Sequence, residues 1–286
     1  DIMEVIKTGV LMTLLTLIFI WVGGIIGGTQ GMMIAFVLAG VMNFINYFYS
    51  DTLVLKQYHA IEVGPNEARG LYALVERLAQ KGNLPMPKVY IIPEQIPNAF
   101  ATGRNPSHAA VAVTEGLLGL LNENEVEAVL AHELSHVRHY DILIGTVAAT
   151  ISGAIAIVAN MLQFGAMSSN SDGQNRPNPL LMLFLSIVLP IAAAVIQMAI
   201  SRNREYMADE GAARLTRHPE WLQSALAKLA SYNQRGMIHD ATPESAHMFI
   251  INPFSGKDIS FASLFTTHPS TEDRIERLEA LKAQIH

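Results

Sequence analysis

The chain has 286 residues, of which half are hydrophobic, 15% are charged and none is cysteine. So apolar a composition excludes an ordinary soluble protein of this length, and the lack of thiols excludes disulfides and thiolate metal sites. The net charge of −6 argues against nucleic acid as a partner, since proteins that bind nucleic acid usually present a basic surface.

Three long stretches carry no charged side chain: residues 8–50, 142–167 and 180–200. A helix that crosses a membrane needs about 20 apolar residues, so the first stretch is long enough for two helices. The glycine-rich segment 23–31 divides it. The sequence therefore predicts four transmembrane helices, near residues 6–24, 31–49, 142–164 and 180–200.

Some of these helices have alternative interpretations. The first could be a signal peptide, but an uncleaved anchor is favoured, because a second apolar run follows at once and no small-x-small cleavage site precedes charged sequence. The third and fourth could be buried or re-entrant helices of the polar domain. Their length and lack of charge favour spanning, and a membrane helix tolerates Pro190 better than a soluble helix does.

The distribution of charge predicts the orientation in the membrane. All but two of the 19 Lys and Arg residues lie in residues 51–141 or 201–286. The positive-inside rule then places both termini and both polar segments on the cytoplasmic side. We expect an N-terminal membrane hairpin, the first part of the polar domain, a second membrane hairpin and the second part of the polar domain, at residues 1–50, 51–141, 142–200 and 201–286.

The two polar segments are expected to form one split domain that is mostly helical. Strands are predicted at residues 88–92 and 109–113. Residues 236–268 lack clear periodicity, and so long a loop is usually functional or mobile, so we expect it to cover a functional site. Helices are predicted near residues 66–82, 115–121, 122–138, 201–215, 218–233 and 270–284.

His132 and His136 are four positions apart, with Glu133 directly after the first of them. On a helix this spacing places both imidazoles on one face, where they can bind one metal ion, and Glu133 can reach a bound water. The combination is typical of zinc proteases. A surface helix with two histidines by chance is the alternative, but Asn122 and Glu125 form a capping-box pattern that favours a well-defined helix.

Two histidines and a water leave a zinc ion one protein ligand short. The candidates are His139, Asp141, Glu205, Asp209 and His268. Glu205 and Asp209 are four positions apart and share a helix face, so one can bind the metal while the other orients a ligating histidine.

Several motifs occur together and in one order. They are Asn-Ala-Phe-Ala-Thr-Gly at 98–103, His-Glu-x-x-His at 132–136 followed by Asp141, Ser-Arg-x-Arg-Glu-Tyr-x-Ala-Asp at 201–209 and His-Pro-x-x-x-x-Arg at 268–274. With the paired apolar runs, this set resembles the HtpX-type membrane zinc metalloproteases. These are gluzincins related to the CAAX prenyl endoprotease. The resemblance assigns no role to Asp141.

The resemblance implies an α+β zincin-like catalytic domain, mostly helical with a small sheet, combined with four transmembrane helices. It implies one zinc ion per chain, bound by His132, His136 and Glu205. Asp209 is then the carboxylate that orients a ligating histidine, and Glu133 is the general base.

The resemblance also implies residues around the substrate. His268 and Arg274 would lie over the cleft and stabilise the oxyanion, and Asn98 would lie near the substrate backbone. The strand at 109–113 would be the edge to which an extended peptide adds, although a core strand is the alternative. Its substrate-binding residues would be Ala109, Val111 and Val113.

The family resemblance further implies an endopeptidase of the bacterial inner membrane that cuts misfolded or damaged membrane proteins on the cytoplasmic side. It implies roles in the stress response and protein quality control, alongside the ATP-dependent membrane protease. Only residues 137–141 and 201–204 separate His136 and Glu205 from apolar runs, which favours substrate segments that leave the bilayer.

Three alternatives remain at this stage. An intramembrane metalloprotease would carry the histidine motif inside an apolar run, whereas polar residues 122–125 precede it here. A prenyl-protein-type protease would be expected to have more membrane helices. An inactive metal-binding membrane scaffold would not need Glu133, because binding alone requires no general base.

Overall fold

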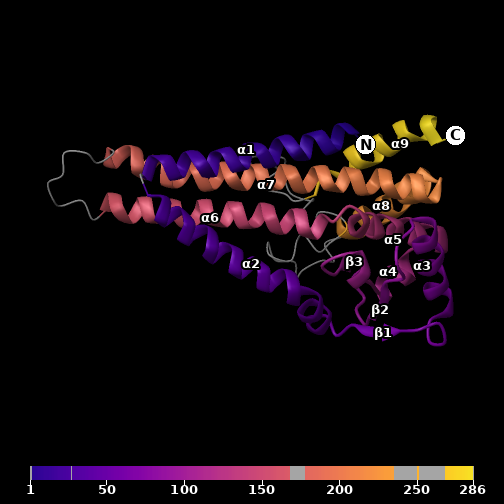
Figure 1. Cartoon of the computed structure of the whole chain (residues 1–286). Coiled ribbons are helices and arrows are strands. Elements are labelled where there is room, and N and C mark those ends of the chain that lie inside the picture. Colours follow the sequence, from indigo (N-terminus) through magenta and orange to yellow (C-terminus); the bar gives the residue numbers. More distant parts are fainter. Residues whose placement is uncertain (1, 27, 168–177, 235–249, 251–267, 286) are drawn as a thin grey trace. The chain divides into compact units, whose positions relative to one another are not determined.

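The computed structural model describes residues 2–26, 28–167, 178–234, 250 and 268–285 (Figure 1). This part of the chain forms two compact units. One, the polar unit, consists of Tyr47–Leu143 and Ser201–His286, and the other, the apolar unit, of Ile2–Asn46 and Ile144–Ile200. The predicted loop 236–268 lies outside the described residues, apart from Ile250 and His268.

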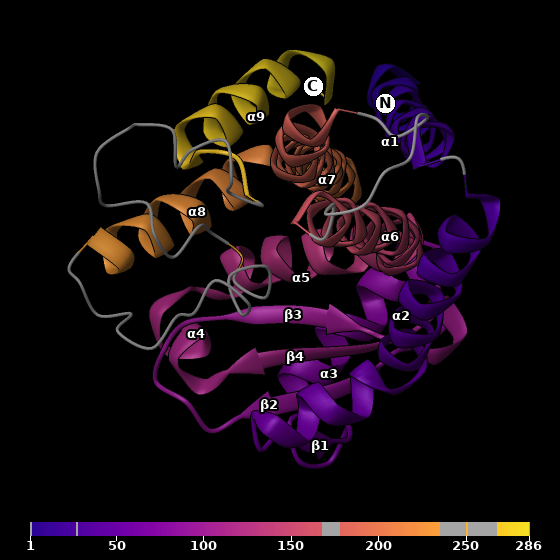
Figure 2. The ribbon, with the colours of Figure 1, turned by 90° about the vertical axis from the view of Figure 1, so that its left-hand side faces the viewer.

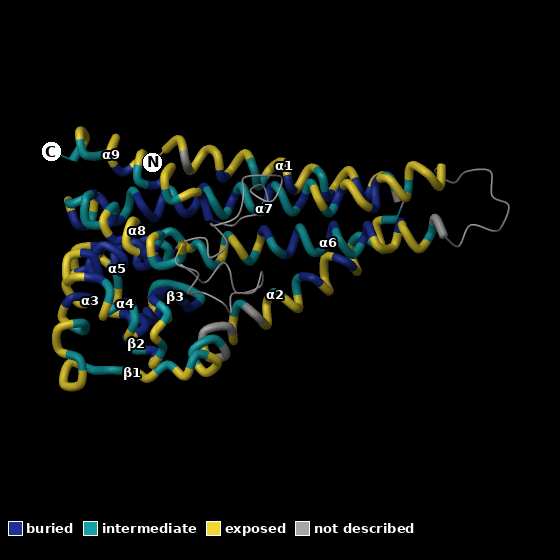
Figure 3. The backbone as a smooth tube through the Cα atoms, turned by 180° about the vertical axis from the view of Figure 1, so that it is seen from behind, coloured by how far each residue is buried: buried dark blue, intermediate teal, exposed yellow. Residues whose placement is uncertain are grey.

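Four helices are long and apolar enough to cross a membrane: α1 (Ile2–Ile26), α2 (Thr29–Gln57), α6 (Asp141–Met167) and α7 (Pro179–Thr216). Within the apolar unit, side chains such as Leu15 and Ile155 are fully buried. Others, such as Phe164 and Leu180, are more than 70% exposed, as expected for surfaces that face lipid (Figure 3). The predicted set of four apolar helices is confirmed.

Helix α7 is longer than the sequence predicted. It runs without interruption from Pro179 to Thr216, where we expected an apolar helix at 180–200 and a separate polar helix at 201–215. Pro190 lies inside it. The composition changes from apolar to polar near residue 200, but no glycine or proline stands there to end the helix. Glu205 and Asp209 are therefore carried by the same helix as the fourth apolar run.

The polar unit contains a four-stranded sheet in the order β1-β2-β4-β3 (Figure 2). Strands β2 and β4 are parallel, and the other two pairs are antiparallel. The prediction for β2 matches, and β4 begins one residue later than predicted, while β1 and β3 were not predicted because such short strands give little periodicity. The strands are β1 (Ile61–Val63), β2 (Lys88–Ile92), β3 (Ala99–Thr102) and β4 (Ala110–Thr114).

The sheet order corrects one expectation about the edge strand. Strand β4, which includes Val111 and Val113, is an inner strand, because β2 pairs with one side of it and β3 with the other. All five of its residues are buried. Strand β3 takes the edge position instead. The sequence marked residues 98–103 as a motif without recognising a strand there, which is why the edge was assigned to the wrong segment.

Helix α5 (Glu123–Arg138) lies against β3 and contacts the neighbouring helices α3 and α8 (Figure 2). The predicted capping box is present: the Asn122 side chain accepts a hydrogen bond from the Glu125 N–H, and the Glu125 side chain accepts one from the Asn122 N–H. The other helices of this unit are α3 (Arg69–Lys81), the 3-10 helix η1 (Pro106–His108), α4 (Glu115–Leu120), α8 (Pro219–Gln234) and α9 (Thr271–Ile285).

The core of the polar unit is formed by one apolar face of α5 together with the sheet and helices α3, α8 and α9. Leu130 and Leu134 of α5 are at most 1% exposed. Their neighbours in this core include Leu78, Val111, Leu226 and Leu278. Burying a leucine side chain contributes about 1.5–3 kcal/mol, so this packing fixes the helix that carries the two histidines.

Candidate metal centre

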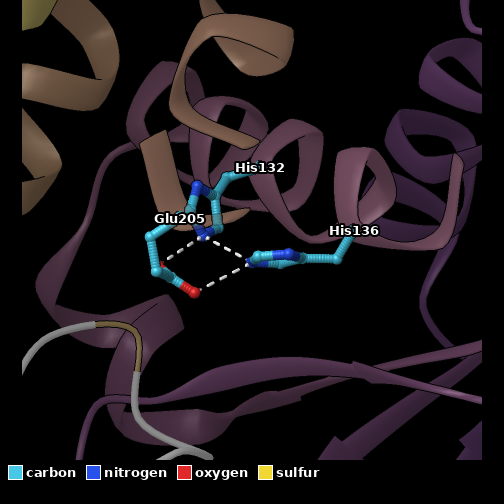
Figure 4. Close-up of side chains that lie close together, drawn as sticks. All are labelled: His132, His136 and Glu205. Carbon is cyan, nitrogen blue, oxygen red and sulfur yellow. Dashed lines mark hydrogen bonds and ion pairs between the residues drawn. The ribbon is translucent and has the colours of Figure 1, made fainter. Parts of the chain in front are cut away.

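His132 and His136 present their Nε2 atoms to the same space, as the spacing of four on a helix predicts. The two Nε2 atoms are 3.1 Å apart. His132 is only 1% exposed. Both side chains therefore leave α5 toward one point inside the polar unit (Figure 4).

Glu205 reaches this point from α7. Its Oε1 lies 3.2 Å from His136 Nε2, and its Oε2 lies 3.4 Å from His132 Nε2 (Figure 4). These three side chains form a group with one ligand atom from each within 4.8 Å of the others. Ligand atoms at 2.0–2.2 Å from a tetrahedral zinc ion are about 3.3 Å apart, so the spacing suits such an ion.

The chemistry of these three ligand side chains also suits a metal cation. Glu205 Oε2 is buried and accepts no hydrogen bond from any described residue. A buried carboxylate oxygen that lacks a hydrogen bond is costly, and a divalent metal ion would remove that cost. Two imidazoles and a carboxylate are the ligand set of many catalytic zinc sites, which keep a further position open for water.

Asp209 and Arg274 lie behind His132. Asp209 Oδ1 is 2.9 Å from His132 Nδ1, so Asp209 occupies the orienting position that the resemblance implied. Arg274 donates from Nε and Nη2 to the two oxygens of Asp209, at 2.8 and 2.7 Å, and from Nη1 to the Ile250 carbonyl at 2.6 Å.

The position of Arg274 differs from the sequence expectation that it stabilises an oxyanion. Its side chain is only 1% exposed, and its Nε, Nη1 and Nη2 groups all donate to Asp209 or the Ile250 carbonyl. A guanidinium used in this way holds Asp209, and its Nη2 also lies 3.8 Å from Glu205 Oε2. The sequence showed a cation near His268 but could not show which carboxylate it faces.

His136 has a carboxylate of its own, which sequence reasoning left without a role. Its Nδ1 lies 2.6 Å from Asp141 Oδ2. Asp141 forms an ion pair with Arg204. The signal in the sequence was the position of Asp141, five residues after His136 and three residues after the end of the helix that carries it.

Glu133 faces the edge strand. Its Oε2 accepts a hydrogen bond of 3.0 Å from the N–H of Ala101 in β3. The residue is 6% exposed. Burial raises the pKa of the Glu133 carboxyl above its ordinary value, a direction that suits a group that must take up a proton near neutral pH.

His268 and Asn98 complete the surroundings of the centre. His268 is 5% exposed, and its Nδ1 lies 3.3 Å from Glu205 Oε2. Asn98 is also buried, and its Oδ1 accepts a hydrogen bond from the N–H of Ala99 at the start of β3. Of the predicted substrate-binding residues, Asn98 therefore adjoins the edge strand, whereas Ala109, Val111 and Val113 lie in or next to the inner strand β4.

A family comparison identifies the chain. The family model of peptidase family M48 matches residues 65–282, which include all the residues of this centre. The chain belongs to peptidase family M48.

Relatives of this M48 peptidase are similar along their full length. This chain is 66% identical over 283 residues to a "Protease HtpX homolog" from Campylobacter hominis. The match covers 99% of this chain and 100% of the relative. The chain is 62% identical to one from a Sulfurovum species, covering 98% and 100%. The resemblance to HtpX-type metalloproteases is confirmed, and the M48 peptidase is a metalloprotease that acts on proteins.

A solved structure has a similar fold. The crystal structure of S. mikatae Ste24p superposes with a TM-score of 0.59 at 19% sequence identity, over 97% of this chain and 66% of that one. This likeness supports the mostly helical fold with a small sheet. Together with the four apolar helices and the HtpX relatives, it makes the M48 peptidase a multi-pass membrane protein.

Proposed function

We propose that this M48 peptidase is a zinc endopeptidase that cleaves misfolded or damaged membrane proteins on the cytoplasmic side of the bacterial inner membrane. The observation that carries the chemistry is the convergence of His132, His136 and Glu205, with Glu133 beside them. These three side chains would hold one zinc ion per chain. Membership of a metallopeptidase family supports the metal site.

The residues around the centre then have distinct tasks. A zinc ion held by these ligands would polarise a water molecule and lower the pKa of that water towards about 7. Glu133 accepts a proton from that water and delivers it to the leaving amine. His268 donates to the substrate carbonyl oxygen as negative charge develops there. Asp209 holds His132 in the tautomer whose Nε2 faces the metal.

The substrate is bound in an extended conformation along β3, the edge strand. Ala99 and Ala101 donate their N–H groups to Asn98 Oδ1 and Glu133 Oε2, and not to β4. In an antiparallel pair, the N–H and the C=O of one residue point to the same side of its strand. The backbone groups of Ala99 and Ala101 therefore face away from β4. A peptide that adds to this side of β3 would replace Asn98 Oδ1 and Glu133 Oε2 as the acceptors of these N–H groups, and would run past Glu133.

The preference for membrane proteins follows from the sequence around the ligands. His136 and Glu205 are each separated from an apolar run by five residues or fewer. A cleft attached so closely to spanning helices acts on segments that have just left the bilayer. The stress response and protein quality control, alongside an ATP-dependent membrane protease, are the setting that we propose for this activity.

Cleavage of model substrates tests the proposal. A scissile segment is placed at increasing distances from the membrane helix of a substrate and incubated with the full-length enzyme in vesicles, and zinc content is measured on the same preparation. We expect one zinc ion per chain and fastest cleavage close to the helix. Equal rates at all distances and on a soluble version of the segment would refute the substrate class, and activity without bound metal would refute the mechanism.

A further inference from the structure

Asp141 connects a ligating histidine to an arginine on another helix. Its Oδ2 lies 2.6 Å from His136 Nδ1, and its other oxygen pairs with Arg204 Nη2. Arg204 also donates from Nη2 to the His139 carbonyl at 2.6 Å. His136, Asp141 and Arg204 thus form a continuous polar chain, in which Arg204 belongs to α7 and Asp141 is the first residue of α6.

The backbone turn between α5 and α6 creates this arrangement. Helix α5 ends at Arg138, and the His139 N–H still donates to the Ser135 carbonyl at 3.0 Å. Tyr140 then adopts a left-handed conformation with φ of 56°, and α6 begins at the next residue. A non-glycine residue in this region costs about 1 kcal/mol or more, so other contacts must hold it. Arg204 supplies one such contact at the His139 carbonyl.

Burial and charge indicate that the ion pair between Asp141 and Arg204 orients His136. The side chains of Asp141 and Arg204 are both 10% exposed. An ion pair buried to this degree adds little net stability, because desolvation offsets most of its attraction. Its carboxylate is aimed at His136 Nδ1, and a carboxylate there fixes the proton on Nδ1 and leaves Nε2 free to bind a metal.

The other ligating histidine has the same kind of support. His132 Nδ1 faces Asp209, which is held by Arg274. Each imidazole is therefore backed by one aspartate that is itself fixed by one arginine. The two sets differ in origin: Arg274 comes from α9, whereas Asp141 and Arg204 come from the two helices that continue into the apolar runs.

We propose that Asp141 and Arg204 are positioning residues that hold His136 in its ligating orientation, and that α6 and α7 supply this support together. The inference rests on the proposed zinc site. It assigns a charged residue close to each of these two apolar runs to the support of the metal centre, so the geometry of His136 depends on the ends of α6 and α7 staying joined.

Zinc affinity of the full-length protein in detergent tests the proposal. Affinity is measured by competition with a chromophoric chelator, the absorption spectrum is recorded after cobalt substitution, and thermal unfolding is followed without metal. We expect Asp141→Asn to weaken zinc binding about 10–100-fold and to change the cobalt spectrum. Arg204→Met acts in the same direction, and Arg204→Lys restores part of the affinity because it keeps the charge beside Asp141.

Arg214→Met is the matched control, because Arg214 lies on the same helix and pairs with Glu210 in an i,i+4 arrangement. It should leave zinc affinity and the cobalt spectrum unchanged. The proposal is overturned if Asp141→Asn and Arg204→Met bind zinc as tightly as this control with the wild-type cobalt spectrum, even if their unfolding temperatures fall. If the wild-type protein itself binds no metal, the proposed function fails. Failure of the positioning proposal alone is distinguished from this, because the wild-type protein then still binds zinc.

Discussion

The N–H of Ala101 donates a hydrogen bond of 3.0 Å to the carboxylate of Glu133, so the edge strand and the proposed base are in direct contact. Ala101 belongs to β3 and Glu133 to α5. In the proposed mechanism, a peptide that adds to β3 would lie beside the group that moves the proton. The contact would thus link the binding of substrate to the proposed chemical step.

Glu133→Gln should keep zinc bound and abolish proteolysis, because glutamine fills the same space but cannot take up a proton. Digestion of casein and the zinc content of the purified variant measure the two effects. Glu123→Gln, at the exposed start of the same helix, is the control and should remain active. Near-normal turnover by Glu133→Gln would show that another group is the base.

Glu205→Ala should lose most of its zinc, because it removes one of three protein ligands. Asp209→Ala should bind zinc about 10–100-fold more weakly, since it removes only the partner that orients His132. Chelator competition measures both affinities. Total loss of zinc from Asp209→Ala with none from Glu205→Ala would reverse the two assignments.

Arg274→Met should weaken zinc binding and also destabilise the protein by about 3–5 kcal/mol, because it leaves the Asp209 carboxylate buried without its partner. Zinc affinity and chemical unfolding are measured on the same variant. Arg274→Lys should recover part of the zinc affinity and part of the stability, because it keeps a positive charge beside Asp209. The recovery is incomplete because a single ammonium cannot make the bidentate pair. If turnover alone fell, with zinc affinity and stability unchanged, Arg274 would instead act on the oxyanion.

Glu125→Gln should lower the free energy of unfolding by about 1–3 kcal/mol near neutral pH. The carboxylate accepts hydrogen bonds from Ser224 and Lys228, at 2.6 and 2.8 Å, and so joins α5 to α8. Glu276→Gln, on the exposed side of α9, is the control and should leave stability unchanged.

The contribution of Glu125 should also depend on pH. Burial acts to raise the pKa of this carboxyl, but hydrogen bonds from Lys228, Ser224 and the Asn122 N–H outweigh it, so the pKa lies below its ordinary value. The stabilisation is therefore complete above the unfolded-state pKa of about 4.3 and is lost as the pH falls through the lower folded-state pKa. Unfolding curves of wild type and variant should converge in acid, and a constant difference would contradict the assignment.

Local patterns in the sequence predicted the elements that depend on neighbouring residues. The capping box at Asn122 and Glu125 and the strand at Lys88–Ile92 were predicted correctly, because their hydrogen bonds and side-chain period are set within a few residues. Strand β3 was missed because its four residues owe their conformation to pairing with β4. The same dependence on distant pairing led to the wrong edge strand.

The sequence by itself determined the four apolar helices and placed His132 and His136 on one helix face, since hydrophobic length and helical spacing are local properties. Only the tertiary structure decided how the charged residues pair. Arg274 meets Asp209 across 65 positions, and Arg204 meets the Asp141 carboxylate and, 65 positions away, the His139 carbonyl. Such pairs form because folding brings side chains of α6, α7 and α9 together within the polar unit, and a buried charge must find its partner among the groups that lie there.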